Sequence, residues 1–170
     1  MSGAQDRPAD RPLIGWRYWA LGSEGWLRSI TQRRVEWVPG RPVRAACVGG
    51  GHPAPAPGCG CGVYGAGDLA TLAGHGLCLP HDEVLVAGEV GLWGAVLIDE
   101  DGIRGQFGYP ASLLVVRETA SQPGVGAVRE RLVPYGVPVS EISFVDAVGD
   151  VSAAVMAFQA MSRSTAPTLR

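Results

Sequence analysis

The segment from Cys47 to Tyr64 (CVGGGHPAPAPGCGCGVY) constrains the fold more than any other part of this sequence. It contains three of the four cysteines and one of the three histidines, and most of its other residues are Gly, Pro or Ala. Such a segment lacks the apolar period of a helix or a strand, so it has no local core that could hold it in one conformation. We therefore expect a bound metal ion to fix it.

A disulfide is the other cross-link that cysteines can form, and the sequence argues against one. The amino-terminal residues MSGAQDRPADRP are polar and lack the apolar core of a signal peptide, so we expect the chain in the reducing cytoplasm. A bridge between Cys59 and Cys61 would close a small, strained ring. No membrane association is expected either, because the longest apolar run, Val90 to Ile98, is far shorter than the roughly 20 residues of a spanning helix.

Structural zinc is usually bound by four thiolate or imidazole ligands in a tetrahedron, and two sets of four compete here. One set lies within the segment itself. The other combines Cys59-x-Cys61 with Cys78-x-x-His81, which is similar to the C-x-C…C-x-H pattern of SWIM-type zinc fingers but has one additional residue in its second pair. Either set fills every coordination position with protein atoms, which favours a structural site over a catalytic one. The first set is Cys47, His52, Cys59 and Cys61.

Several short motifs occur together along the chain. They are Gly15-Trp16-Arg17, Cys47, His52 to Pro57 followed by Cys59 to Tyr64, Gly88-Glu89-Val90 with Leu92-Trp93-Gly94, and Gly108-Tyr109-Pro110. This combination, over roughly residues 13 to 140, resembles a family of small uncharacterised actinobacterial proteins. The resemblance implies no activity, and His75, Cys78 and His81 fall outside its pattern. It implies that Cys47, His52, Cys59 and Cys61 belong together as ligands.

The first part of the chain is typical of an antiparallel meander. Alternating side chains predict a strand over residues 13–21, in which Trp16 and Trp19 point to opposite faces. Further short strands are expected at 26–31 and 34–38. An extended segment over 42–48 then leads into Cys47 as the last strand of the meander.

The strongest strand signal follows the cysteine-rich segment. Residues 84–98 and 103–109 predict a hairpin around the turn Asp99-Glu100-Asp101-Gly102, with Gly88, Gly91 and Gly94 indicating bulges. Helices are expected at 68–73, capped by Asp68, at 123–132 with Val125, Val128 and Leu132 on one face, and at 150–161. We therefore expect an α+β fold: a curved, mainly antiparallel sheet or partial barrel, a metal-tied Pro/Gly loop, and two helices near the carboxyl terminus.

The length of 170 residues and the 46% hydrophobic content fit one domain with its own core. We expect a single domain over residues 12–162, with its metal-binding loop at 47–81, between disordered tails at 1–11 and 163–170. The tryptophans are expected to pack in the core, Trp93 in the core of the long hairpin.

No catalytic motif is recognisable, so we expect a non-catalytic binding or adaptor module stabilised by a structural zinc ion, with an unidentified protein partner. One alternative is an enzyme that uses His75, Cys78 or His81 near the metal loop. Another is a nucleic-acid-binding regulator, because residues 1–46 carry eight Arg and four acids, a charge of +4, whereas residues 47–170 carry six Arg and twelve acids, a charge of −6. The arginines that alternate with tryptophans there are Arg28, Arg33, Arg34, Arg41 and Arg44.

Overall fold

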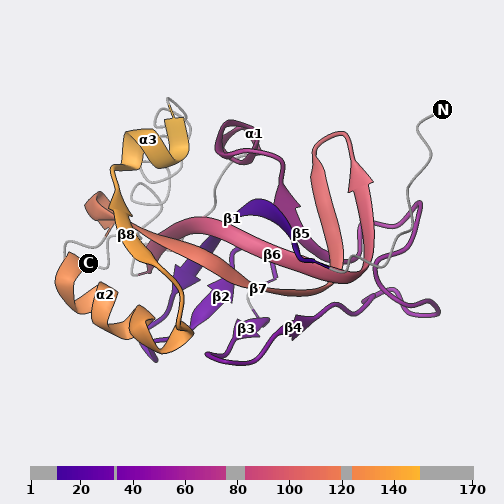
Figure 1. Ribbon diagram of the computed structural model, residues 1–170, viewed down its shortest axis with the longest axis horizontal. Coiled ribbons are helices and arrows are strands. Elements are labelled where there is room, and N and C mark those ends of the chain that lie inside the picture. Colours follow the sequence, from indigo (N-terminus) through magenta and orange to yellow (C-terminus); the bar gives the residue numbers. More distant parts are fainter. Residues whose placement is uncertain (1–10, 33, 76–82, 120–123, 150–170) are drawn as a thin grey trace, which may run out of the picture.

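The computed structural model describes residues 11–32, 34–75, 83–119 and 124–149, and Figure 1 shows how their elements are arranged. The strands are β1 (Leu13–Leu21), β2 (Leu27–Ser29), β3 (Glu36–Trp37), β4 (Val43–Arg44), β5 (Val63–Ala66), β6 (Val84–Asp99), β7 (Gly102–Val116) and β8 (Val139–Ile142). The α-helices are α1 (Leu69–Gly74), α2 (Val125–Leu132) and α3 (Phe144–Val148), and short 3-10 helices cover Arg117–Thr119 and Val133–Tyr135.

The long hairpin of β6 and β7, which the sequence predicts, lies at the centre of the sheet. Asp99 pairs with Gly102 around the two-residue turn, and the pairing register shifts after Glu89 and again after Trp93. The second shift lies at Gly94, whose φ of 79° is in the region that favours glycine. These bulges bend the hairpin, which explains the curvature of both strands in Figure 1.

Strand β7 is longer than the sequence predicts, because it continues through Pro110 to Val116. The register shift places Pro110 opposite Val90 and Ser112 opposite Glu89, so Ala111 is an extra residue on β7. Proline has no N–H to donate and is tolerated in a strand beside such a bulge.

The expected meander is only partly correct. Strands β1, β2 and β3 are paired antiparallel in that order, and β1 has the predicted bounds. Strand β4 does not continue this series, because it pairs with β7 through Val43 with Gly108 and Arg44 with Phe107. Hydrophobic alternation predicts a strand but not its partner, and this partner lies far away along the chain.

The sheet closes on itself as a ring of four strands. Strand β1 pairs with β6 along its whole length, β6 pairs with β7, β7 pairs with β5, and β5 returns to β1 through Trp16 and Ala66. The other pairs are antiparallel as well, except β8, which runs parallel to β7 at the edge. The expected α+β class with a curved, mainly antiparallel sheet is therefore confirmed.

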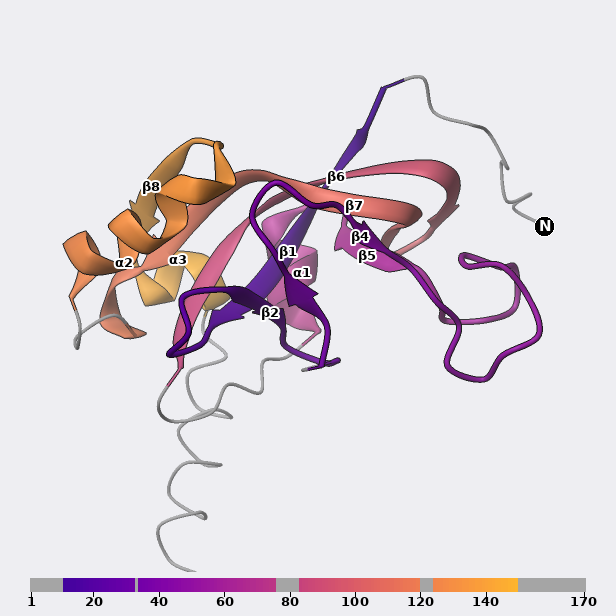
Figure 2. The same ribbon diagram turned by 90° about the horizontal axis from the view of Figure 1, so that it is seen from below.

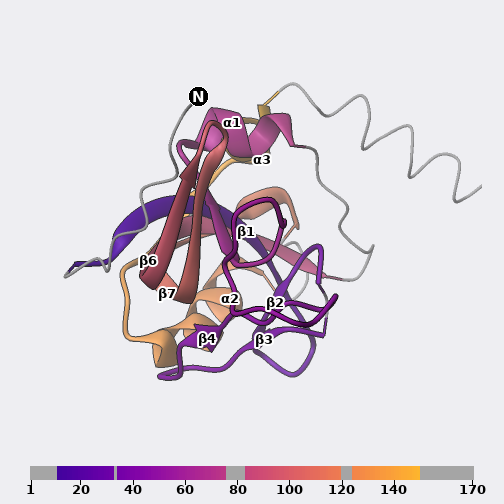
Figure 3. The ribbon, with the colours of Figure 1, turned by 90° about the vertical axis from the view of Figure 1, so that its right-hand side faces the viewer.

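Both faces of the sheet are buried, and helices lie on each. Figure 1 shows α1 and α3 above the long strands of the hairpin and α2 below them, and in Figure 3 α1 and α3 again lie at the top of the view, with α2 lower down. On β6, Val84 and Val86 belong to the cluster on the α2 face, whereas Leu85 and Ala87 belong to the cluster under α1 and α3. The predicted apolar stripe of α2 is confirmed, since its buried residues are Val128 and Leu132, with Val125 packed against the same cluster.

The remaining helix predictions have different outcomes. The side chain of Asp68 caps α1 by accepting a hydrogen bond from Thr71 N at 2.7 Å, as expected. Helix α3 is not among the predicted helices, and its short length gives little periodicity to detect. The helix predicted at 150–161, the carboxyl-terminal tail and nearly all of the amino-terminal tail lie outside the described residues.

Candidate metal centre

The cysteine-rich loop lies between two strands, β4 and β5, that pair with successive segments of β7. Strands β4 and β5 both pair with the same edge of β7, one after the other. The N–H of Ala45 donates to the carbonyl of Gln106 at 2.8 Å, and Val63 pairs with Gly105, the residue of β7 adjacent to Gln106. Residues 46–62 therefore leave the sheet and return to it at neighbouring positions, and Figure 2 shows the loop projecting from this point.

The loop brings together the four residues of the first ligand set. One ligand atom from each of Cys47, His52, Cys59 and Cys61 lies within 4.8 Å of the other three. The Sγ of Cys47 is 3.4 Å from Nε2 of His52 and 3.8 Å from Sγ of Cys59, and the Sγ of Cys61 is 4.0 Å from Nδ1 of His52. This group is able to hold a single metal ion.

The orientation of the His52 ring suits a metal ligand. Its Nδ1 lies 3.0 Å from the carbonyl oxygen of Pro53, and because a carbonyl can only accept, Nδ1 carries the proton of this bond. The same bond is the main reason why the pKa of His52 is raised. With Nδ1 engaged, Nε2 is left with a free lone pair beside Cys47, which is the usual arrangement of a metal-binding histidine.

The thiols differ in how readily they lose a proton. Hydrogen bonds from the backbone and side chain of Cys61, and from the side chain of Cys47, lower the pKa of Cys59 from 9.0 to about 7. Burial, together with the neighbouring Cys59, raises the pKa of Cys61. A cysteine binds a metal ion as a thiolate, and the lowered pKa of Cys59 favours that form.

Arg104 on β7 fastens the loop to the sheet. Its Nη1 donates to the carbonyl oxygens of Cys59 and Cys61, the latter at 3.1 Å, and its Nε donates to Asp99 Oδ2 at 2.7 Å. Only 12% of the side chain is exposed, and the bond to Asp99 is the first cause of its raised pKa. Sequence reasoning missed this residue, because a single arginine in a hairpin strand carries no signal of what it contacts.

Of the histidine and cysteine residues of the alternative enzyme function, only His75 lies among the described residues, and it is not assembled with this site. His75 is exposed after α1, its ring centroid 5.8 Å from that of Tyr64, and it is not part of the ligand group. Cys78 and His81, and with them the second ligand set, lie outside the described residues. Among the arginines, Arg28 forms ion pairs with Glu24 at 2.7 Å and Glu36 at 3.4 Å, which reduce its net attraction for phosphates.

Trp93 does not lie in the core, which corrects the prediction made from its apolar surroundings. Strand residues alternate between faces, and since Leu92 is fully buried, Trp93 points to the other face. There it is partly exposed and stacks on Phe107, with ring centroids 6.1 Å apart.

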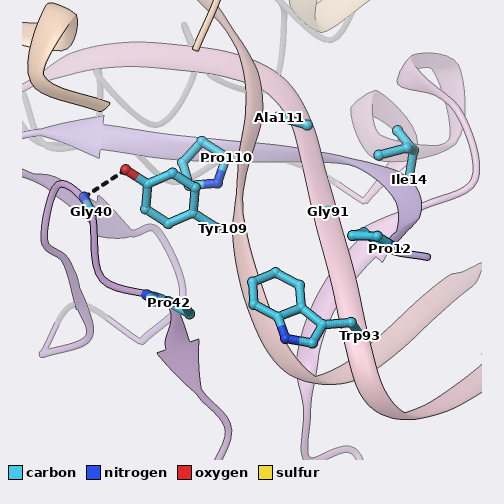
Figure 4. A pocket seen from close by; sticks show the side chains of 9 residues that line it. All are labelled: Pro12, Ile14, Gly40, Pro42, Gly91, Trp93, Tyr109, Pro110 and Ala111. Atoms are coloured by element: carbon cyan, nitrogen blue, oxygen red, sulfur yellow. Dashed lines mark hydrogen bonds between the residues drawn. The ribbon is translucent and has the colours of Figure 1, made fainter. Parts of the chain in front are cut away.

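Trp93 and Tyr109 line an open apolar cavity of about 380 Å³ together with three prolines (Figure 4). The hydroxyl of Tyr109 accepts a hydrogen bond from Gly40 N at 2.7 Å and donates one to the carbonyl of Tyr135 at 3.0 Å. No acidic or basic side chain lines this cavity among the described residues. The cavity therefore presents an open, apolar and partly aromatic surface.

No protein-family model, curated protein or solved structure matches this chain. Within the described ranges, no helix combines the length and the apolar character needed to cross a membrane.

Proposed function

We propose that this chain is a non-catalytic binding module whose projecting loop is held by one structural zinc ion bound to Cys47, His52, Cys59 and Cys61. The observation that carries the proposal is the convergence of three thiols and one imidazole from a loop with almost no buried side chains. Such a set of soft and borderline ligands favours zinc over calcium or magnesium, which prefer oxygen.

The distances support a tetrahedral ion. With Zn–S bonds of about 2.3 Å and Zn–N bonds of about 2.0 Å, a regular tetrahedron has S···S edges of about 3.8 Å and S···N edges of about 3.5 Å. The gap between the sulfurs of Cys47 and Cys59 is 3.8 Å, and the gap from Cys47 Sγ to His52 Nε2 is 3.4 Å. The longest gap within the group, at most 4.8 Å, exceeds an ideal edge by only about 1 Å.

A structural role is favoured over a catalytic one by the number of ligands. Catalytic zinc usually has three protein ligands and keeps a position for water, whereas this set supplies four. The apolar cavity beside Trp93 supports the same conclusion, because it offers an exposed aromatic surface but no free acid or base among the described residues. The ion would then stabilise the loop and take no part in a reaction.

Metal analysis of the purified protein tests this proposal. We expect about one zinc per chain, lost on replacement of Cys47, Cys59 or Cys61 by Ala, because three protein ligands leave an incomplete site. The matched control is His75→Ala, which changes an exposed histidine outside the ligand group and should leave the zinc content unchanged.

Cys78→Ala distinguishes the two ligand sets that the sequence leaves open. This variant should retain its zinc if the first set is correct. Protein that carries no bound ion without ever having met a chelator would refute the metal site, and a larger loss of zinc from Cys78→Ala than from Cys47→Ala would transfer it to the second set.

A further inference from the structure

A second cavity, of about 180 Å³, lies beside the metal loop on the α2 face of the sheet. Its inner wall includes the buried side chains of Trp37 and Val63, and Arg44 is exposed at its margin. Ala46 and Gly62, the first and last residues of the loop, also line it. The cavity is smaller than the roughly 300–1,000 Å³ of sites for drug-sized ligands, so it suits a ligand of only a few non-hydrogen atoms.

Arg17 on β1 contributes an unpaired positive charge to this cavity. Its Nη1 donates to the carbonyl of Tyr64 at 2.7 Å and its Nη2 to the hydroxyl of Ser29 at 3.0 Å, both neutral acceptors. Its Nε is buried without a hydrogen-bond partner. No carboxylate of the described residues forms an ion pair with it, and burial lowers the pKa of Arg17 to about 10.

The surroundings of Arg17 compensate only part of the cost of removing this charge from water. The guanidinium carbon lies 5.1 Å from the centre of the Trp37 ring, a cation–π contact. Arg17 as a whole is only partly buried, but a charge largely removed from water without a partner of opposite sign is still unfavourable, so such groups are normally paired. An anion in the adjoining cavity would supply the missing partner.

The polar groups around the cavity are suited to an oxyanion. Arg17 is a cation, and no acidic side chain is among the described residues that line the cavity. Arg44 also lines it, but the guanidinium carbon of Arg44 lies 5.9 Å from the centre of the Phe107 ring and is therefore not aimed into the cavity. The hydroxyl oxygen of Ser29 accepts from both Arg17 Nη2 and Trp37 Nε1, so within the described part of the chain its own proton remains available to a ligand. Gln32 at the margin adds an amide donor.

We propose that this cavity binds a small oxyanion, a carboxylate or a phosphate, through the charge of Arg17 and the hydroxyl of Ser29. The apolar walls of Trp37 and Val63 keep the local dielectric low and strengthen the attraction between opposite charges. The site goes beyond the proposed zinc-dependent function. Because Arg17 and Ser29 belong to β1 and β2, its test does not depend on which metal the loop holds.

An NMR titration of the purified, metal-loaded protein tests the site. Sodium phosphate and sodium acetate are titrated separately, each against sodium chloride at equal ionic strength, while the indole N–H signal of Trp37 is followed. We expect saturable shifts with at least one of the two oxyanions and none with chloride. Saturation by phosphate, by acetate or by both supports the site and identifies which oxyanion it prefers.

Two variants and one matched control locate the binding. Ser29→Ala, which removes the hydroxyl whose proton is available to a ligand, should weaken binding about tenfold, the usual effect of losing one hydrogen bond to a charged group. Arg17→Gln should abolish binding. Arg41→Gln removes another exposed charge that does not line the cavity, and it should bind as the unchanged protein does.

The proposal is wrong if chloride reproduces the shifts at equal ionic strength, or if neither oxyanion saturates. Equal affinities of Ser29→Ala and Arg41→Gln for the oxyanion would contradict it as well. If Arg17→Gln does not fold, the comparison of Ser29→Ala with Arg41→Gln still decides the question.

Discussion

Replacing Arg104 by Gln should weaken zinc binding by about 10- to 100-fold, the usual effect of removing a group that orients metal ligands. Arg104 donates to the carbonyl oxygens of Cys59 and Cys61, so it fixes the backbone on both sides of this C-x-C pair. Its charge also matters, because three thiolates and one neutral imidazole around Zn²⁺ leave a net charge of −1. Glutamine keeps a donor but cannot reach both carbonyls or balance this charge.

The expected magnitude follows from the contacts of Arg104. A hydrogen bond that involves a charged group contributes about 1.5–3 kcal/mol, and losing one such bond matches the about 1.4–2.8 kcal/mol that a 10- to 100-fold change represents. Solvent screens the interaction little, since only 12% of the side chain is exposed. The ion pair with Asp99 holds the guanidinium in place, so Asp99→Asn should produce a smaller loss of the same kind.

Competition with a chromogenic chelator measures the zinc affinity of each variant. Arg129→Gln is the matched control, because it removes the same charge from an arginine on α2 that pairs with Glu141 away from the loop. Arg104→Lys keeps the charge but loses the planar fork, so it should fall between Arg104→Gln and the unchanged protein. An unchanged zinc affinity of a folded Arg104→Gln variant would refute the reasoning that this side chain orients the ligands.

Two further predictions concern the sheet. Deleting residues 46–62 and joining Ala45 directly to Val63 should give a folded protein without bound zinc, because the two ends pair with neighbouring residues of β7. Thermal unfolding and metal analysis check this prediction. An unfolded product would show that the loop supports the core. Burial raises the pKa of Tyr18 and Tyr135 from 10.0 to about 12, so the unfolded chain loses these protons at a lower pH than the folded protein does. The free energy of unfolding should therefore fall between about pH 10 and pH 12, by up to roughly 3 kcal/mol for each tyrosine. Urea unfolding across this range should show a shallower fall in Tyr135→Phe, and an identical slope in the variant would contradict the assignment.

The sequence predicts those parts of the fold that depend on local pattern. Strand β1 has the expected bounds, and the hairpin of β6 and β7 has the expected turn, because side-chain alternation and turn chemistry act between near neighbours. The pairing of β4 with β7 depends on contacts between distant segments, which periodicity does not encode. For the same reason the apolar neighbours of Trp93 gave a wrong prediction, since burial depends on what covers each face of the strand.

In the candidate site, too, the features that depend on local sequence could be predicted and those that depend on distant segments could not. Cys47, His52, Cys59 and Cys61 are conspicuous because chemically unusual side chains crowd a segment without periodicity, although spacing alone left two ligand sets open. Arg104 could not be predicted, since its partners are backbone carbonyls of a distant loop. Arg17 does carry a signal, because a charged residue at the centre of a largely apolar strand requires a polar partner on a buried face.

The stability of the core and the order of the loop depend on different interactions, because the backbone of the loop joins the sheet at its two ends. Backbone pairing with β7 fixes both ends of residues 46–62, so we expect the sheet to form without them. The loop itself has one buried side chain, Ala54, and hydrophobic burial therefore cannot order it. An ion bound to the four proposed ligands would divide the loop into short closed segments, and the free energy of metal binding would replace the missing core. Because Ala46 and Gly62 also line the cavity beside Arg17, the ion that orders the loop would at the same time define one wall of the oxyanion site.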